Sequence, residues 1–302
     1  MYDVIIIGSG PSGMSTAIYT QRSGLKTLVI EKGMYGGQLN NTLEIENYIG
    51  VGKVSGMELS DSMNQQMESF GVESVYGDVI SVTKEGELFV VVTDSDSYVA
   101  KSVVVATGTQ HRKLGVEGEE IYNGRGVSYC AVCDGAFFKN ANIHVVGGGD
   151  SALEEGEYLT NFGEKITLIH RRDTFRATPI LQNRFLNKDN TATILKSQVS
   201  KIIGDGTKVT HLEIVNDLNQ KEKIASDAVF IYVGANPNTS FLDNSVLDSE
   251  GYVITNEHLE TSIKGLFGSG DVRSGSKRQV ATAVGDGAVC GLEVYKYIIE
   301  TK

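Results

Sequence analysis

The 302-residue chain has three prolines, three cysteines and no tryptophan, against 35 glycines. Three cysteines are too few for a disulfide framework in a chain of this length, which argues against a disulfide-stapled secreted protein. No apolar run approaches the roughly 18 residues of a membrane span, and no signal peptide is expected at the N-terminus. A net charge of −11 disfavours general binding to nucleic acids or anionic membranes. We therefore expect a cytoplasmic globular protein, long enough for two domains.

A nucleotide-binding turn is predicted at the start of the chain. Residues 4–7 form an apolar run typical of a buried parallel strand, and residues 14–22 have a helical pattern. Between them lies a G-x-G-x-x-G motif, whose glycines allow a tight turn and a close approach to a pyrophosphate. A second strand, residues 27–30, ends in Glu31, which is placed to accept hydrogen bonds from a ribose. An ordinary glycine turn is the alternative, and the acidic residue in register favours a bound dinucleotide.

The same pattern recurs in the middle of the chain. Residues 142–146 form an apolar run, which a G-x-G-x-x-A turn and a helical stretch through Leu159 follow. The next strand, residues 166–169, ends at His170. This second unit is therefore predicted to bind a dinucleotide as well.

The residue that follows the second strand differs between the two units. Gly8 to Glu31 spans 31 − 8 = 23 positions, and Gly147 to His170 spans 170 − 147 = 23. The position that is acidic in the first unit thus begins a basic cluster in the second, formed by His170, Arg171, Arg172 and Arg176. Because arginines attract a 2′-phosphate and an acid repels it, the second unit is predicted to prefer NADPH to NADH, with a solvated basic turn as the alternative.

Each unit is followed by a set of β-rich runs. We expect strands at residues 79–82, 88–93 and 98–106 after the first unit, and at 199–203, 209–215 and 223–233 after the second. A helix is expected over 59–70 and another from Arg278 to Ile299. The run 265–272 does not begin a third copy, so it is predicted to return to the first domain. The second unit is then an insertion, with domains at 1–112 plus 242–302 and at 113–241.

Two of the three cysteines, Cys130 and Cys133, stand in C-x-x-C spacing with Asp134 directly after them. Such a pair is a redox dithiol or half of a zinc site. No histidine lies at a metal-ligand spacing, so we predict no metal and favour the dithiol. Cys290 lies in an apolar helical pattern and is expected to be a buried core thiol.

An acidic ribose partner in the first unit and a phosphate clamp in the second predict FAD in the first and NADPH in the second. A flavin links a hydride donor to a disulfide, because each exchange moves two electrons. The predicted function is therefore transfer of electrons from NADPH through FAD to the dithiol.

The chain resembles the bacterial-type, low-molecular-weight thioredoxin reductases, which are flavoproteins of the pyridine nucleotide-disulfide oxidoreductase family. The resemblance covers nearly the whole chain, and its motifs occur in order. They are Gly8-x-Gly10-x-x-Gly13, Gly36-Gly37-Gln38-Leu39, Ala106-Thr107-Gly108, Cys130-Ala131-Val132-Cys133-Asp134-Gly135, Gly147-x-Gly149-x-x-Ala152, His170-Arg171-Arg172-x-x-x-Arg176, Gly270-Asp271-Val272 and Arg278-Gln279.

The resemblance implies roles for the redox residues. Cys133 is implied to face the flavin, Cys130 to attack the disulfide of thioredoxin, and Asp134 to act as general acid and base. Three further residues are implied to help grip thioredoxin, with ordinary packing as the alternative: Arg125, Phe137 and Phe138.

The resemblance and the motifs together give the expected cofactor residues. For FAD these are Gly8, Ser9, Gly10, Pro11, Ser12, Gly13, Glu31, Lys32, Gly36, Gly37, Gln38, Leu39, Asn47, Thr107, Gly108, Asp271, Val272, Arg278, Gln279 and Val280. For NADPH they are Gly147, Gly149, Asp150, Ser151, Ala152, His170, Arg171, Arg172, Arg176 and Gly234.

The implied fold is α/β, with two Rossmann-like dinucleotide-binding domains of three-layer ββα architecture and the NADPH domain inserted into the FAD domain. The implied assembly is a homodimer, and the implied activity is that of an NADPH-dependent thioredoxin-disulfide reductase. Since the dithiol and the nicotinamide share one domain and one flavin, a domain rotation between half-reactions is expected. Two alternatives stay open: a reductase of another thioredoxin-like or peroxiredoxin-system partner, and a non-catalytic redox sensor.

Overall fold

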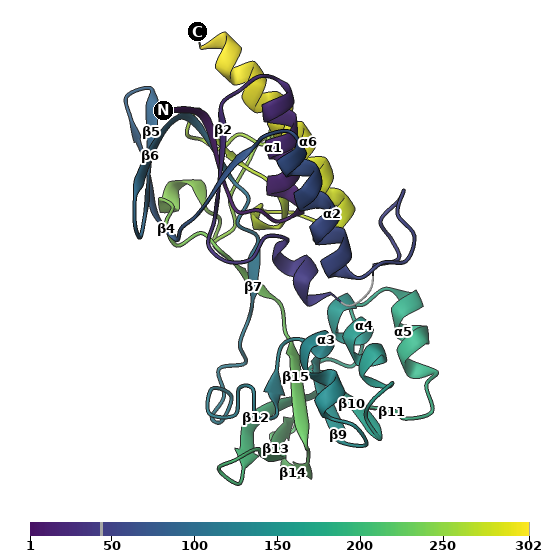
Figure 1. The fold of residues 1–302 in the computed structure, drawn as a ribbon. Helices are drawn as coiled ribbons and strands as arrows, with labels where there is room; N and C mark the ends of the chain where they lie inside the picture. Colours follow the sequence, from purple (N-terminus) through teal and green to yellow (C-terminus); the bar gives the residue numbers. More distant parts are fainter. Residues whose placement is uncertain (43–44, 302) are drawn as a thin grey trace. The chain divides into compact units, whose positions relative to one another are not determined.

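The computed structural model describes residues 1–42 and 45–301, without the side chains of Val132 and Cys133. The chain divides into two compact units (Figure 1). Unit 1 contains Met1–Gln110 and Asn236–Lys302, and unit 2 contains His111–Ala235.

Unit 1 is built on one mixed sheet with the strand order β3-β2-β1-β6-β5-β4, and β17 pairs with β6. The buried strand β1 lies between two parallel neighbours, β2 and β6, as its continuous apolar run predicts. On the other side of β6, β5 and β4 continue the sheet as an antiparallel meander. The strands are β1 Tyr2–Ile7, β2 Thr27–Glu31, β3 Glu73–Tyr76, β4 Val79–Glu85, β5 Leu88–Thr93, β6 Ser97–Val105 and β17 Leu266–Gly268.

The longest helix of the described chain, α6, lies alongside α1 in unit 1 (Figure 1). The two helices approach closely because α6 has glycines at the contact. A Cβ at Gly287 would stand 2.3 Å from the Ser12 carbonyl oxygen, and one at Gly291 would stand 2.6 Å from the Tyr19 Cβ. The helices of this unit are α1 Pro11–Arg22, α2 Gly56–Ser69 and α6 Val280–Glu300, with 3₁₀ turns η1 Gly37–Asn41, η3 Asn244–Val246 and η4 Gly270–Val272.

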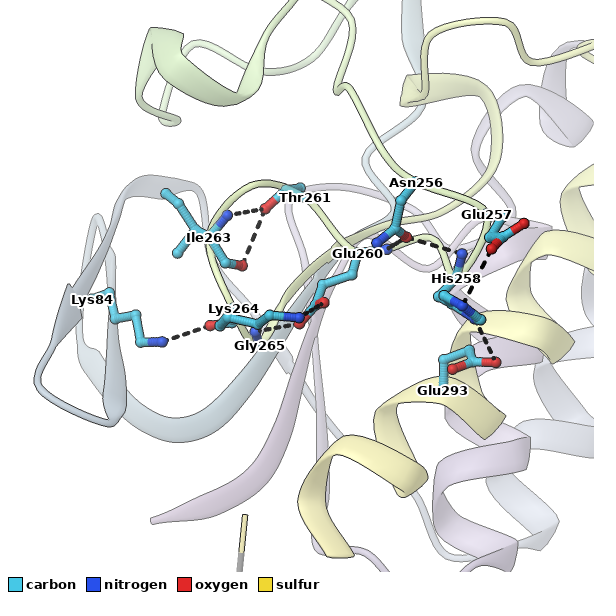
Figure 2. Close-up of polar contacts among 10 residues, drawn as sticks. All are labelled: Lys84, Asn256, Glu257, His258, Glu260, Thr261, Ile263, Lys264, Gly265 and Glu293. Atoms are coloured by element: carbon cyan, nitrogen blue, oxygen red, sulfur yellow. Dashed lines mark hydrogen bonds and ion pairs between the residues drawn. The ribbon is translucent and has the colours of Figure 1, made fainter. Parts of the chain in front are cut away.

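The segment before β17 is fastened to both the meander and α6, as Figure 2 shows. The Glu260 side chain is buried, and its carboxylate accepts from the Lys264 Nζ at 2.7 Å and from the Gly265 backbone N at 3.0 Å. Lys84 of β4 donates to the Lys264 carbonyl oxygen, and His258 contacts Glu293 of α6 at 3.3 Å. These contacts hold β17 against β6, so the last part of the chain completes the sheet of unit 1.

Unit 2 has a parallel sheet of order β11-β10-β9-β15-β8 and a separate antiparallel sheet of order β12-β13-β14. Its strands are β8 Val127–Ser128, β9 Asn142–Gly147, β10 Lys165–Ile169, β11 Thr191–Ile194, β12 Ser197–Gly204, β13 Val209–Asn216, β14 Lys221–Ala225 and β15 Ala228–Tyr232. Its helices are α3 Ala131–Asp134, α4 Asp150–Leu159 and α5 Pro179–Leu186, with the 3₁₀ turn η2 Gly135–Phe137.

The expected single strand over 223–233 is wrong, because the run contains two strands that belong to different sheets. The break falls at Ser226 and Asp227. The Asp227 carboxylate accepts from the Asn142 backbone N at 2.9 Å, and the buried Ser226 hydroxyl bonds the His144 ring at 2.8 Å. These polar contacts to the start of β9 turn the chain from the antiparallel sheet into the parallel one.

The two segments that connect the units form a short ribbon, in which β7 Thr109–His111 pairs with β16 Ala235–Pro237. Two backbone bonds bracket it: Arg112 N to the Gly234 O at 2.8 Å, and Asn238 N to the Gly108 O at 3.0 Å. Residues 236–241, which the sequence boundaries placed in the insertion, pack with unit 1. The Thr107 hydroxyl donates to the Asn238 carbonyl oxygen at 2.7 Å, and the Asn238 side-chain amide donates to the Thr107 carbonyl oxygen at 2.8 Å, which explains this placement.

Candidate active site: two nucleotide-binding turns and a C-x-x-C segment

The glycines of the first turn serve different purposes. At Gly8, where φ is +100°, a Cβ would stand 2.6 Å from the Ala106 carbonyl oxygen, and at Gly13 it would stand 1.9 Å from the Gly8 carbonyl oxygen. Gly10, the residue before α1, has an ordinary φ of −73°, and a Cβ there meets no described atom within 4 Å. The fold therefore requires Gly8 and Gly13, whereas Gly10 leaves open space at the start of a helix, where an anion is stabilised.

Glu31 ends β2 beside this turn, and its carboxylate is held by protein donors. Oε2 accepts from the Ser9 backbone N at 2.7 Å and from the Ser9 hydroxyl at 2.9 Å, and Oε1 accepts from the Gly33 N at 2.9 Å. A carboxylate has about four acceptor sites, so it keeps capacity for a ribose hydroxyl. Ser9 thus positions Glu31.

A cavity of about 620 Å³ lies at the carboxyl ends of β1 and β2 in unit 1. The expected FAD residues among those that line it are Gly8, Gly10, Pro11, Ser12, Glu31, Lys32, Gly37, Gln38, Thr107, Gly108 and Asp271. Burial raises the pKa of the Asp271 carboxyl, which accepts from the Ser276 hydroxyl at 3.2 Å. Lining residues that the motifs did not indicate include Met34, Asp78, Asn238 and Phe241.

The other expected FAD residues are not part of the lining of this cavity. Asn47 donates to the Gln279 side chain at 3.1 Å, although 232 positions separate them. Arg278 donates to the Tyr252 hydroxyl at 2.7 Å. The remainder pack in the fold: Leu39 and Val272 are buried, Val280 starts α6, and a Cβ at Gly36 would strike Ser60.

The second turn repeats the division of glycine roles in unit 2. A Cβ at Gly147 would stand 2.5 Å from the Tyr232 carbonyl oxygen and 2.6 Å from the Ala152 Cβ. Gly149, the residue before α4, has no described atom within 4 Å of a Cβ position. Asp150 accepts from the Thr178 N at 2.6 Å. Gly149 therefore occupies the position in unit 2 that Gly10 occupies in unit 1.

The basic loop after β10 is fastened onto this turn. The backbone N of Arg176 donates to the Gly148 carbonyl oxygen at 2.7 Å. The side chains of Arg171, Arg172 and Arg176 are exposed, and His170 is 6% exposed. Burial lowers the pKa of His170, whose Nε2 lies 3.1 Å from the Thr174 carbonyl oxygen. The cationic groups of this loop at neutral pH are therefore its arginines, and His170 packs beneath Gly148.

The C-x-x-C segment runs from β8 into α3, in unit 2. The Ser128 hydroxyl accepts from the Cys130 N at 3.0 Å, and the Ala131 N donates to the Tyr232 hydroxyl at 2.8 Å. The Cys130 side chain is half-buried. The side chain of Cys133, which was expected to face a flavin, lies outside the described residues.

A hollow of about 540 Å³ adjoins this segment, and Asp134, Arg125, Phe137 and Phe138 all line it. Phe137 is 81% exposed, whereas Phe138 packs edge-to-face on Phe230. The Arg125 guanidinium donates to the Ile121 carbonyl oxygen at 2.6 Å. An exposed aromatic ring and a cation beside the half-buried Cys130 side chain form a surface that suits a protein substrate.

Two buried residues that hold this segment were missed by sequence reasoning. The carboxylate of Glu119, 2% exposed, accepts from the Tyr129 hydroxyl at 2.6 Å and from the Leu114 and Gly115 backbone N atoms at 2.8 and 2.7 Å. Tyr232 holds Ala131, as described above. Neither lies in a recognisable motif, and both partnerships depend on tertiary contacts.

Among residues 1–42 and 45–301, no group of three or more metal-ligating side chains is found, and no helix is long and apolar enough to cross a membrane. In the same residues, Cys290 is a free and fully buried cysteine.

Two strand–turn–helix units, with a C-x-x-C segment in the second, define a dinucleotide-dependent disulfide oxidoreductase. The model of the pyridine nucleotide-disulphide oxidoreductase family matches residues 2–287, and the chain belongs to this family. It is 50% identical to the thioredoxin reductase of Listeria monocytogenes, over 100% of this chain and 95% of that protein. It is 45% identical to that of Bacillus subtilis, over 99% and 96%. The crystal structure of Lactococcus lactis thioredoxin reductase matches with a TM-score of 0.97 at 47% identity, over 99% and 100%.

Proposed function

We propose that this chain catalyses the NADPH-dependent reduction of a thioredoxin disulfide, through FAD and the redox pair Cys130 and Cys133. The observation that carries the proposal is the position of the C-x-x-C segment. It is part of the unit that has the arginine loop, and it borders the hollow lined by Asp134, Arg125 and Phe137.

The cavity of unit 1 fits FAD. Its lining combines a carboxylate at the end of β2 with open space at Gly10, where a side chain would intrude on a pyrophosphate. In unit 2, Gly149 leaves the same space, and Arg171, Arg172 and Arg176 are available for a 2′-phosphate. When bound, FAD passes two electrons between a nicotinamide and a dithiol, and NADPH supplies them as a hydride.

The residues of the segment then carry out thiol–disulfide exchange. The Cys130 thiolate attacks one sulfur of the substrate disulfide, forming a mixed disulfide and releasing one substrate thiolate. Cys133 attacks the Cys130 sulfur, which closes the Cys130–Cys133 disulfide and releases the second thiolate. The two protons released by the Cys130 and Cys133 thiols end on the substrate thiols. Asp134, in the adjoining hollow, accepts them and passes them on, and it donates a proton to the pair when the pair is reduced again.

We propose that the units rotate relative to each other between half-reactions, about the ribbon of β7 and β16. Both the dithiol and the arginine loop belong to unit 2 and must alternate at one cofactor of unit 1. A covalent tether between the units is expected to stop turnover with thioredoxin while FAD remains bound. Undiminished turnover in the tethered protein would contradict the rotation.

We propose a homodimer for the assembly, supported by exposed apolar residues on the outer face of α6. They are Val289, Leu292 and Ile299, with exposed fractions of 44%, 52% and 47%. Leu292→Glu is expected to give monomers in sedimentation analysis, and Ile80→Glu, at an exposed apolar residue of β4, is the control. We place the protein in the cytoplasm, where reducing systems keep a working dithiol in use.

The test of the function is spectroscopic. The yellow protein is expected to bleach on addition of NADPH and to regain its colour on addition of oxidised thioredoxin. Rates with thioredoxin, with another thioredoxin-like protein and with a peroxiredoxin-system partner then rank the substrates. A protein that fails to cycle with any of them is a redox sensor rather than a reductase.

A further inference from the structure

The redox segment is held from behind by a buried phenol that no motif indicates. Ala131, between the two cysteines, is fully buried, and its backbone N donates to the Tyr232 hydroxyl at 2.8 Å. Tyr232 ends β15 and is 9% exposed, and its carbonyl oxygen faces Gly147 so closely that no side chain fits there. The hydroxyl is therefore fixed by the sheet that also positions the second nucleotide turn.

Helix α4, which carries Glu155, packs against both α3 and β15, the strand that Tyr232 ends. The Oε2 atom of Glu155 is sealed from solvent and has no hydrogen-bond partner among the described residues. Burial raises the pKa of both Glu155 and Tyr232, and a smaller interaction between the two groups adds to the shift of Tyr232. A phenol has one proton and two lone pairs, so Tyr232 can accept from Ala131 and still direct its proton to Glu155. A buried carboxyl oxygen without a hydrogen-bond partner costs folding free energy, so its presence calls for a functional explanation.

We propose that Tyr232 and Glu155 are positioning residues for the dithiol: Tyr232 fixes the backbone that carries Cys130, and Glu155 sets the charge behind it. This inference rests on the proposed reductase function. Ala131 is adjacent to Cys130, so loss of its acceptor releases the backbone on which the attacking thiol is mounted.

The charges around Glu155 give the proposal a pH signature. Burial, followed by the neighbouring Glu154, raises the pKa of Glu155 to about 8. Asp134 of α3 and Tyr158 of α4 are the other ionisable groups that act on this pair, and the Phe185 ring of α5 packs against the adjacent Gly156. Ionisation of Glu155 above about pH 8 therefore adds negative charge behind the redox segment. A negative charge raises a thiol pKa, so above about pH 8 the thiolate fraction of the dithiol rises less with pH than it would without Glu155.

The test uses the holoenzyme with the dithiol reduced, and it follows iodoacetamide alkylation of the dithiol from pH 6 to pH 10. Glu155→Gln is expected to react about three-fold or more faster than the native protein above pH 8, and equally fast at pH 6. Glu155→Asp should restore the native profile in part. Glu157→Gln, two positions along the same helix, is the matched control and should keep it. Superimposable profiles for Glu155→Gln and native protein overturn the role of Glu155.

Tyr232→Phe tests the role of Tyr232 independently of Glu155. Thioredoxin reduction is expected to fall about ten-fold in kcat, with little change in KM, because the thiol is misplaced rather than the docking surface. NADPH oxidation by ferricyanide should stay within about two-fold of native. Tyr122→Phe, another buried tyrosine of unit 2, is the control. Native kcat in Tyr232→Phe overturns the role of Tyr232. The alkylation profile needs no thioredoxin, so it remains decisive even if thioredoxin is not the substrate.

Discussion

The two kinds of glycine in the first turn can be separated by a single methyl group. In Gly10→Ala, the new Cβ meets no described atom within 4 Å and the backbone keeps an ordinary φ. The protein without FAD should therefore keep its stability to within about 1 kcal/mol. In Gly13→Ala, the Cβ would stand 1.9 Å from a backbone oxygen, which cannot rotate away. This variant should lose about 3 kcal/mol or more.

For FAD binding, Gly10→Ala is the variant that should act directly. The Gly10→Ala methyl group occupies the space at the start of α1 and displaces the pyrophosphate from the backbone N–H groups. Loss of one or two charge-assisted hydrogen bonds costs about 3 kcal/mol, which is about a hundredfold in Kd. Gly149→Ala, the equivalent change in unit 2, should leave FAD binding unchanged and weaken NADPH binding by a similar factor.

Thermal melts of flavin-free protein and titration with FAD, followed by quenching of flavin fluorescence, measure the two quantities independently. Gly10→Ala must be stable and FAD-deficient, and Gly13→Ala must be unstable before any FAD is added. If Gly10→Ala binds FAD with native affinity, the cavity at the end of β1 is not the pyrophosphate site. If flavin-free Gly13→Ala melts like the native protein, the contact with Gly8 does not constrain the turn.

Four further outcomes are expected. Arg171→Ala combined with Arg172→Ala should raise the KM for NADPH about ten- to a hundred-fold and leave that for NADH nearly unchanged, since only NADPH has a 2′-phosphate. Cys130→Ser and Cys133→Ser should each abolish thioredoxin reduction but retain NADPH oxidation by ferricyanide. Cys290→Ala should remain fully active, and native Cys290 should resist alkylation, because complete burial raises its thiol pKa. Glu119→Gln should lower stability by about 1–3 kcal/mol in denaturant melts, because one carboxylate oxygen that accepts buried N–H groups is lost.

Much of this fold is predictable from local patterns. The strand–turn–helix units that contain Gly8 and Gly147 depend on residues within about 30 positions of each other, so they can be recognised in a single sequence. The arginine loop was found by its spacing from Gly147 and lies beside the second turn in the structure. His170, the first residue of this loop, is not one of its cations, because it continues the buried end of β10 and packs beneath Gly148.

The contacts that hold the redox segment were not predictable, for a physical reason. A tyrosine hydroxyl or a glutamate has no periodicity, and its role depends on which backbone N–H lies within 3 Å after folding. Tyr232 meets Ala131 across 101 positions, and Asn47 meets Gln279 across 232. The prediction of one strand over 223–233 was wrong for the same reason, since the break depends on Asp227, whose partner is Asn142 at the start of β9.

Because β7 and β16 pair where the chain leaves and re-enters unit 1, unit 2 can be deleted and the two ends of unit 1 joined. The bonds that bracket the ribbon of β7 and β16 join Arg112 to Gly234 and Gly108 to Asn238, so the position midway between them on one strand, Gln110, faces Asn236 on the other. The chain thus leaves unit 1 and re-enters it at neighbouring points. A protein in which a short glycine linker joins Gln110 to Asn236 would retain the sheet of unit 1, its cavity and α6. Such a minimal flavin-binding protein would let the affinity of that cavity be measured without the nicotinamide unit.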